Sequence, residues 1–377
     1  MKKNDKRRIT GIILAGGASK RMGECKALLP AAAESSALET IVTRMRSPVV
    51  SDIIVVTGGY RGKITKEAKR LKCQTVFNPE HKSGMYSSLL AGVRALPSDA
   101  EAFFVLPVDT PLVKPFTYAS LIEAFYEGYG SPDVVYPTFM GRRGHPPLIG
   151  RTMIEPILSW SGEGGLRGLL SNCPCKAMDL QTGDRSVTLD MDTKIDHERL
   201  LEYAKSEFFP DADECSELLR IAETPTRVVM HARVVARCAA LIMGALAKGG
   251  VKINGKLLAS ACLLHDLAKG KKNHEARGAQ WLRNRGYGKV AKIVASHKDL
   301  IPNKHIGEAE ILYLADKITD GETVSSISAR MVRVEARFPA GSEALDNARR
   351  RLLHAADIQR KVESVVGAAL DKILSSL

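Results

Sequence analysis

The sequence predicts two consecutive folding units: an α/β unit with a mainly parallel sheet over residues 1–209, and an all-α unit over residues 215–377. The length of 377 residues exceeds the size at which a single hydrophobic core usually stops growing. Up to residue 209, short apolar runs alternate with helical segments, which is typical of a parallel sheet with helices on both faces. After an acidic stretch at residues 208–214 that contains a proline and is expected to be a linker, only helical patterns follow.

The elements of the first unit can be placed from these runs. The predicted strands lie at residues 12–14, 53–57, 75–78, 103–108 and 134–137. The predicted helices between them lie at residues 37–45, 62–71, 87–96 and 116–127. In sheets of this kind, ligands bind at the carboxyl ends of the strands, so the residues that follow each strand are the first candidates for a site.

The second unit is predicted to be entirely helical. Its helices are expected at residues 214–221, 227–247, 255–264, 274–285, 290–297, 307–318 and 342–374. The last of them carries an amphipathic stripe and is expected to be a core or dimer helix.

Composition narrows the class of protein. The formal net charge of +13 suits ligands rich in phosphate, and it could also indicate nucleic acid. Aromatic residues make up only 5% of the chain and no long basic run is present, so nucleic-acid binding is not favoured. Seven irregularly spaced cysteines do not form a disulfide framework and are expected to be reduced. With no apolar run of about 18 residues, no membrane span is predicted, and the expected compartment is the cytoplasm.

A glycine-rich loop follows the first predicted strand. The apolar residues 12–14 lead into Ala-Gly-Gly at residues 15–17, and two cations follow at Arg21 and Lys26. Glycines let backbone N–H groups approach an anion closely, and a strand that leads into such a loop is a common phosphate-binding arrangement. Arg21 can bind phosphate oxygens through its forked guanidinium, and Lys26 can supply a point charge. The alternative is a purely structural turn between a strand and a helix.

A carboxylate follows a second predicted strand. Asp109 comes directly after the apolar run at residues 103–108, so it should lie at the same edge of the sheet as the glycine loop. A carboxylate there could simply cap the next helix. It could also supply the hard oxygen ligand that Mg²⁺ needs in a site that handles phosphates.

These strings resemble a known family. Residues 14–26 match the signature LAGGxSxRMGxxK of the molybdenum cofactor guanylyl- and cytidylyltransferases, and Asp109 occupies the position of their metal-binding D-x-P segment. Three further stretches resemble the family's N…GMxxSL segment, its GHPxL loop and its D-x-D-T stretch; they are Asn78 with residues 84–89, residues 144–148 and residues 190–193. The resemblance departs from the family pattern at residues 194–196, where Lys-Ile-Asp stands in place of Pro-Glu-Asp, and in the Ala/Ser-rich segment 31–36.

The resemblance implies a Rossmann-like nucleotidyltransferase domain. The catalytic residues it implies are Arg21, Lys26 and Asp109, with Mg²⁺ held by Asp109 and Asp192. The nucleotide-binding residues it implies are Leu14, Ala15, Gly16, Gly17, Arg21, Lys26, Asn78 and Ser87. The acceptor loop it implies contains Gly144, His145 and Pro146.

In the reaction implied by this resemblance, an acceptor phosphate attacks the α-phosphorus of a nucleoside triphosphate, and pyrophosphate leaves. The cytidylyl branch fits better than the guanylyl branch, so CTP is the expected nucleotide. Molybdopterin is the expected acceptor, and a molybdoenzyme that receives the cofactor is a further expected partner. An enzyme that activates a sugar phosphate or choline phosphate is the first alternative, and a nucleotide-binding sensor that regulates the second unit is another.

The second unit carries its own chemistry. His231, the doublet His265-Asp266 and Asp316 each lie within a helical stretch whose apolar residues should face the core. Burying such groups without partners is costly, and a divalent metal held by imidazoles and carboxylates removes that cost.

The order H…HD…D resembles the HD superfamily of metal-dependent phosphohydrolases over residues 225–325. The resemblance implies a divalent transition metal such as Mn²⁺, Fe²⁺ or Ni²⁺ at His231, His265, Asp266 and Asp316. His274 and His297 match histidines that bind a second metal in some members, and His305 is the alternative. Lys269 is a candidate contact for a substrate phosphate, and the substrate itself is not readable from these residues.

Overall fold

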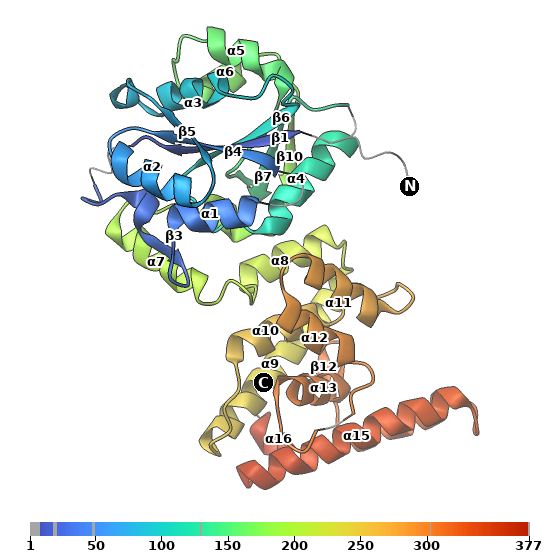
Figure 1. Ribbon diagram of the computed structural model, residues 1–377. Helices are drawn as coiled ribbons and strands as arrows, with labels where there is room; N and C mark the ends of the chain where they lie inside the picture. Colours follow the sequence, from blue (N-terminus) through green and yellow to red (C-terminus); the bar gives the residue numbers. More distant parts are fainter. Residues whose placement is uncertain (1–7, 18–20, 47–49, 129, 302, 376–377) are drawn as a thin grey trace. The chain divides into compact units, whose positions relative to one another are not determined.

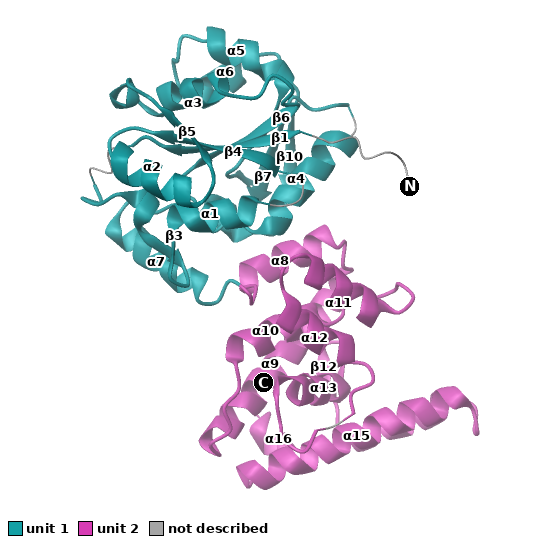
Figure 2. Ribbon diagram, viewed as in Figure 1, with its two compact units in different colours: residues 1–207 teal, residues 208–377 magenta. Residues whose placement is uncertain are grey.

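The computed structural model describes residues 8–17, 21–46, 50–128, 130–301 and 303–375. The chain forms two compact units, residues 1–207 and residues 208–377 (Figure 2). Residues 18–20, which include Ser19 of the predicted glycine loop, lie outside the described residues.

The first unit contains an eight-stranded mixed sheet in the order β10-β7-β9-β6-β1-β4-β5, with β8 paired to β7. Its strands are β1 (Ile9–Ala15), β4 (Val50–Thr57), β5 (Gln74–Phe77), β6 (Ala102–Pro107), β7 (Val134–Phe139), β8 (Arg142–Arg143), β9 (Leu148–Gly150) and β10 (Ala177–Gln181). β1 is central and runs parallel to both β4 and β6, whereas β9 runs antiparallel to β6 and β7. Every residue of β1 and β6 is buried, because helices cover both faces of the sheet.

Two hydrophobic layers hold these helices on the sheet (Figure 1). One layer joins β1, β4 and β6 to α1 (Ala37–Met45), α2 (Arg61–Arg70) and α4 (Pro115–Glu127). The opposite layer joins the other face of these strands to α3 (Met85–Arg94), α5 (Ile154–Ser159) and α6 (Gly165–Asn172). The predicted mainly parallel sheet between two helical layers is therefore confirmed.

The register of the central strands brings the predicted site segments to one edge. Leu14 at the end of β1 is paired with Pro107 of β6, and Ala15 is paired with Thr57 of β4. The glycine loop and Asp109 thus leave the sheet side by side at its carboxyl edge. Two short helical turns, η1 (Lys26–Leu28) and η2 (His81–Ser83), lie in the segments that follow β1 and β5.

Several short elements of the first unit were not predicted. They are the hairpin β2 (Pro30–Ala32) and β3 (Ser35–Ser36), the strands β8, β9 and β10, the helices α5, α6 and α7 (Lys194–Ala204), and the turns η3 (Arg151–Met153) and η4 (Arg185–Thr188). The Ala/Ser-rich segment that departs from the family pattern forms this hairpin, and Ser36 then caps α1 by accepting a hydrogen bond from the Glu39 backbone at 3.2 Å. Residues 194–196, which also depart from the family pattern, form the first turn of α7, where Thr193 and Asp196 form a capping box.

The second unit is a helical bundle. Its helices are α8 (Ala212–Ile221), α9 (Thr226–Lys248), α10 (Gly255–Leu264), α11 (His274–Asn284), α12 (Gly288–Ser296), α13 (Glu308–Ile318), α14 (Ile327–Arg337), α15 (Glu343–Val366) and α16 (Leu370–Ile373). Residues 208–211 of the stretch expected to be a linker lie before α8, and its last three residues form the first turn of that helix, where Asp211 and Glu214 form a capping box.

The helical class predicted for the second unit is confirmed, but three details of its elements were not predicted. A two-residue hairpin, β11 (Thr319–Asp320) with β12 (Thr323–Val324), interrupts the helices directly after α13. The predicted helix at residues 342–374 is two helices, because Gly367 takes a left-handed conformation with φ of 70° and ends α15. α14 was missed because Ile327 is its one buried residue among the described positions.

α9 is long and apolar enough by length and composition to cross a membrane, although no span was predicted. A third of its most apolar window is buried, and its inward face belongs to the core that also includes residues of α10 and α13. This helix also carries His231 into the interior of the unit. A core helix of the bundle accounts for these features.

Candidate functional sites

The glycine loop of the first unit is closely packed against Ser88 and against the residues that follow β4. A Cβ atom on Gly16 would lie 2.8 Å from the Ser88 hydroxyl oxygen, and one on Gly58 would lie 2.3 Å from the Gly16 carbonyl oxygen. The Gly59 backbone also donates a hydrogen bond to that carbonyl at 3.2 Å. The loop therefore depends on the small residues that follow β4, which sequence reasoning did not identify.

The two predicted cations and two predicted carboxylates meet beside this loop. Lys26 Nζ lies 3.3 Å from Asp109 Oδ2 and 2.7 Å from Asp192 Oδ1, while Arg21 Nη2 lies 3.1 Å from Asp192 Oδ2. The Lys26 side chain is 14% exposed, whereas that of Arg21 is 71% exposed. Residues as distant in the sequence as Arg21 and Asp192 are thus brought into one cluster.

The charges of this cluster perturb one another. The hydrogen bond from Lys26 lowers the pKa of Asp192 against the effect of its partial burial, and the charges of Lys26 and Arg21 lower it further. Burial and the neighbouring carboxylates of Asp192 and Asp109 raise the pKa of Asp190. The backbone N–H of Met191 also donates to the Asp109 carbonyl at 3.0 Å, which ties the two acidic segments together. A divalent cation would relieve the repulsion among these carboxylates.

These residues line a cavity of about 510 Å³, a size within the usual range for small-molecule sites. Eight predicted residues line it: Leu14, Ala15, Gly16, Gly17, Arg21, Lys26, Asp109 and Asp192. Met85 and Ser88 of the GMxxSL segment also line the cavity. Lining residues that sequence reasoning missed include Cys25, His81 and Lys82.

Asn78 and Ser87 do not line this cavity. The Asn78 side-chain amide is buried and donates to Ser87 Oγ at 2.8 Å and to Ser88 Oγ at 3.0 Å. Its carbonyl oxygen accepts from the Glu80 backbone at 2.9 Å. Asn78 therefore orients Ser88, which does line the cavity, and holds the chain that leads into α3.

A second cavity of about 880 Å³ adjoins the first, and both are lined by Leu14, Met85 and Pro107. The predicted acceptor-loop residues Gly144 and His145 line this second cavity. Pro146 is buried and does not line it, while the next residue, Pro147, does. Arg142, Arg143 and Arg167 also line it and would suit an anionic acceptor.

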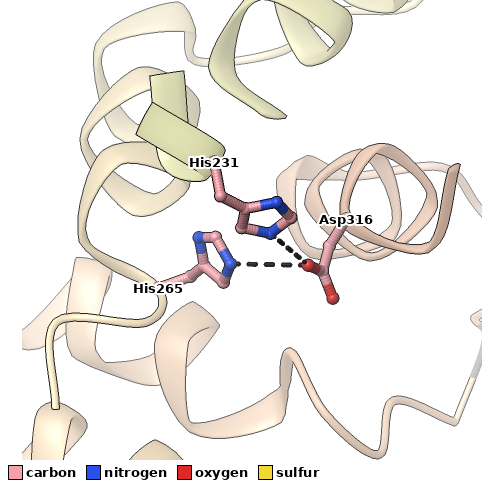
Figure 3. A group of neighbouring side chains, drawn as sticks. All are labelled: His231, His265 and Asp316. Carbon is pink, nitrogen blue, oxygen red and sulfur yellow. Dashed lines mark hydrogen bonds and ion pairs between the residues drawn. The ribbon is translucent and has the colours of Figure 1, made fainter. Parts of the chain in front are cut away.

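In the second unit, His231, His265 and Asp316 come from three helical segments and converge (Figure 3). His231 Nε2 lies 3.1 Å and His265 Nε2 lies 3.5 Å from the same oxygen, Asp316 Oδ1. The Nδ1 atoms contact backbone carbonyl oxygens, Gly321 for His231 at 3.0 Å and Cys262 for His265 at 2.8 Å. Such contacts favour a proton on Nδ1 and leave Nε2 free to bind a metal.

A second trio adjoins the first. Asp266 Oδ1 lies 3.1 Å from His274 Nε2 and 3.3 Å from His297 Nε2, while Asp266 Oδ2 faces His265 Nε2 at 3.5 Å. Within each trio, the candidate ligand atoms lie within 4.8 Å of one another. The structure thus brings together all six predicted residues of this unit, and His305 is exposed and belongs to neither trio.

Metal ions fit this donor set. His265 Nε2, Asp266 Oδ1 and His274 Nε2 are buried and lack hydrogen-bond partners. Buried polar atoms without partners are rare and costly, and these three all face a candidate metal position. Burial opposes the charge on Asp316, but Lys317 and the two histidines lower its pKa well below the ordinary range. Burial also works against protonation of His265, yet Asp316 and Asp266 raise its pKa overall.

The fold and these sites define an α/β unit with a nucleotide-type cavity at its carboxyl edge and a helical unit with a metal-ligand cluster. Comparison with known families agrees. Residues 11–178 match the family described as the MobA-like NTP transferase domain, and residues 228–320 match the family described as the HD domain. The chain belongs to the MobA-like NTP transferase family and carries an HD domain behind its transferase domain. Asp192 lies beyond the first match, as do α14 and α15 beyond the second.

Individual relatives match the first unit. The nicotine blue oxidoreductase of Paenarthrobacter nicotinovorans is 30% identical over 204 residues, which are 51% of this chain and 96% of that protein. The molybdenum cofactor cytidylyltransferase of Escherichia coli (strain K12) is 26% identical over 187 residues, covering 49% of this chain and 91% of that protein. Among solved structures, Rv0371c from Mycobacterium tuberculosis H37Rv matches at 25% identity with a TM-score of 0.45, covering 52% of this chain and 97% of that one.

Proposed function

We propose that the first unit is a Mg²⁺-dependent nucleotidyltransferase that joins the nucleoside monophosphate of CTP to a phosphorylated acceptor of the molybdopterin type. The observation that carries this proposal is the meeting of Lys26 with Asp109 and Asp192 beside the glycine loop. A phosphate acceptor is already ionised near neutral pH, so the site needs charge stabilisation and positioning more than acid–base chemistry.

Each residue then has a defined task. Asp109 and Asp192 would hold Mg²⁺, which neutralises part of the triphosphate charge and orients it. The backbone of Gly16 and Gly17 would contact the phosphates. Lys26 and Arg21 would stabilise the charge that builds up on the departing pyrophosphate. The cavity lined by Gly144 and His145 would receive the acceptor, whose anionic groups suit the arginines there.

The choice of CTP and of molybdopterin rests on the GMxxSL and GHPxL segments and on the cytidylyltransferase relative. A relative named as a probable molybdenum cofactor guanylyltransferase, from Bacillus cereus (strain Q1), is 26% identical over 136 residues, so GTP is the main competitor. A molybdoenzyme would receive the product, and we propose a cytoplasmic location. A sugar-phosphate transferase is the alternative within the same reaction class.

A second candidate function comes from the relative named as an oxidoreductase. Its name shows that likeness to this family does not by itself fix the reaction. Hydride transfer has no need for two carboxylates and a lysine around a phosphate loop, whereas nucleotidyl transfer uses them directly. We therefore favour nucleotidyl transfer for this chain.

We further propose that the second unit is a metal-dependent phosphohydrolase. His231, His265 and Asp316 would hold one divalent ion such as Mn²⁺, Fe²⁺ or Ni²⁺, and Asp266, His274 and His297 would hold another. A bound metal would supply a nucleophilic water at neutral pH. In the alternative function, the first unit binds a nucleotide only to regulate the second unit. The protein would then hydrolyse phosphate esters but would not carry out nucleotidyl transfer.

The test uses pyrophosphate release with each of CTP, GTP, UTP and ATP, and hydrolysis of a chromogenic phosphate ester with Mn²⁺. Asp109→Ala should abolish pyrophosphate release and spare hydrolysis, while His265→Ala with Asp266→Ala should do the reverse. If the wild-type protein releases no pyrophosphate with any nucleotide, the transferase proposal is wrong. If both variants keep both activities, the two site assignments are wrong.

A further inference from the structure

The metal-ligand cluster of the second unit opens into a cavity of about 520 Å³. Its lining includes His231, Asp266 and Asp316. It also includes a wall from α14 and α15, which lie outside the residues matched to the HD domain. This wall is therefore a property of this chain that the match to the HD family does not explain.

The cavity is lined by many more cations than its free carboxylates can balance. Its cationic residues are Arg227, Lys269, Lys298, Lys317, Arg330 and Arg351. Its acidic residues are Asp266, Asp316 and Asp320, and the first two are candidate metal ligands. Asp299 and Glu275, which do not line the cavity, are paired with Arg351 and Lys298. If metals bind Asp266 and Asp316, the remaining cations still leave the cavity surface with a positive excess, which favours a polyanion over a singly phosphorylated compound.

Two of these cations are fixed in place by residues next to the metal cluster. Arg330 of α14 donates to the Thr319 backbone carbonyl, three positions after Asp316. Arg351 of α15 donates from Nε and Nη2 to the two carboxylate oxygens of Asp299 at 2.6 and 3.0 Å, two positions after His297. Both guanidiniums are thereby anchored near the centre, and neither uses all five of its donors in these contacts.

The remaining wall is apolar. Val334 lies one helical turn after Arg330 on α14, Phe338 directly follows the end of that helix, and Leu352 is next to Arg351 on α15. An ion pair between Arg349 and Glu335 at 2.7 Å holds the two helices together. A surface that combines fixed guanidiniums with apolar side chains suits a phosphate chain attached to an organic group.

We propose that the second unit acts on organic compounds with two or more linked phosphates, and that Arg330 and Arg351 bind the phosphate next to the one attacked at the metal centre. In this hydrolysis, water forms a new P–O bond, the bridging P–O bond breaks, and the bridging oxygen leaves with the arginine-bound phosphate. The protons of water pass to the products and solvent. The inference rests on the phosphohydrolase function proposed above, and the dinucleotide and pyrophosphate expected from the first unit both contain such a linkage.

The test compares binding of imidodiphosphate, a non-hydrolysable diphosphate, with binding of inorganic phosphate to the Mn²⁺-loaded full chain by calorimetry. A background of Lys26→Met with Asp109→Ala and Asp192→Ala removes both the cation and the proposed metal ligands of the first unit, so that binding there does not contribute. Imidodiphosphate should bind at least about tenfold more tightly than phosphate, because it reaches both the metals and the arginines. Arg330→Gln with Arg351→Gln, together and singly, should weaken imidodiphosphate about tenfold or more and change phosphate binding less than about threefold.

The matched control is Arg337→Gln with Arg360→Gln, which removes two arginines from α14 and α15 that do not line the cavity. It should leave both affinities unchanged, and Mn²⁺ content should be equal in all variants. Unchanged imidodiphosphate affinity in the Arg330 and Arg351 variants would overturn the proposal, as would an equal loss of affinity for phosphate. Arginine-dependent binding without hydrolysis of any phosphate ester would support the arginine subsite for a second phosphate but refute the phosphohydrolase function and the hydrolysis that rests on it. Ester hydrolysis with arginine-independent binding would support the phosphohydrolase function and refute the arginine subsite.

Discussion

Lys26 provides a sharp test of the transferase site, because its removal should affect metal binding and catalysis in opposite directions. In the described structure Lys26 forms ion pairs with both Asp109 and Asp192. A metal that binds these carboxylates must displace it. Lys26→Met keeps the length of the side chain but removes the charge, so the free protein should bind Mn²⁺ or Mg²⁺ more tightly.

The magnitude follows from the two ion pairs. Each partly exposed pair is worth about 1 kcal/mol or less, and the 38% exposure of Asp192 weakens its share through solvent screening. A gain of about 1–2 kcal/mol corresponds to roughly 5- to 30-fold tighter metal binding. Nucleotidyl transfer should nevertheless fall about 10²- to 10³-fold, as expected when a charge that stabilises the transition state is lost.

Mn²⁺ binding to the site of the first unit is measured by calorimetric titration in a His265→Ala, Asp266→Ala background, which weakens metal binding to the second unit. Nucleotidyl transfer is measured by the release of pyrophosphate. Lys69→Met is the matched control, since Lys69 is exposed on α2 and does not line the cavity. Metal binding that is unchanged or weaker in Lys26→Met would refute the placement of the metal at Asp109 and Asp192. Undiminished transfer would refute the role of Lys26 toward the triphosphate.

Three further predictions follow from the structure. Gly58→Ala should lower the rate of nucleotidyl transfer at least about tenfold, because the added Cβ would lie 2.3 Å from the Gly16 carbonyl oxygen. Gly62→Ala is the control, since its Cβ would meet no atom within 4 Å and the rate should not change. Equal rates for the two variants would contradict the dependence of the loop on Gly58. Asp184→Ala should destabilise the first unit by about 3–5 kcal/mol in urea unfolding, because it removes the carboxylate half of the buried ion pair with Lys114 at 3.3 Å. Burial raises the pKa of Asp184, but the charge of Lys114 and hydrogen bonds to the carboxylate lower it below its ordinary value overall. The stability that Asp184 contributes should therefore persist at neutral pH and disappear only as the pH falls below about 4. Asp179→Ala is the exposed control and should cost less than about 1 kcal/mol of unfolding free energy. Finally, Mn²⁺ should raise the melting temperature of the second unit less at pH 6 than at pH 8. Asp316 and Asp266 raise the pKa of His265 above about 6.5, so protons compete with the metal for this histidine as the pH falls. An increase in melting temperature that does not depend on pH would contradict metal binding at His265.

Much of the fold was predictable because its signals are local. The buried strands β1, β4 and β6 each contain a continuous apolar run, and the helices between them have clear periodicity. The exposed helix α14 and the two-residue strands were missed, because elements with little buried surface leave little trace in the apolar pattern. The end of α15 at Gly367 depends on a left-handed backbone, which the amphipathic stripe across residues 342–374 concealed.

The sequence by itself determined the families of both units and the candidate residues of their sites, because the residue types and their spacing along the chain identify the glycine loop, the carboxylates and the H…HD…D set. Only the tertiary structure decided which of these residues share a site. Strand register places the loop beside Asp109, helix packing joins His274 and His297 to Asp266, and Asn78 and Pro146 turn out not to line the cavities. The cavity wall that α14 and α15 form with Arg330 and Arg351 could not be predicted from the sequence either. Contacts between distant segments arise from packing of the whole core and not from any local pattern.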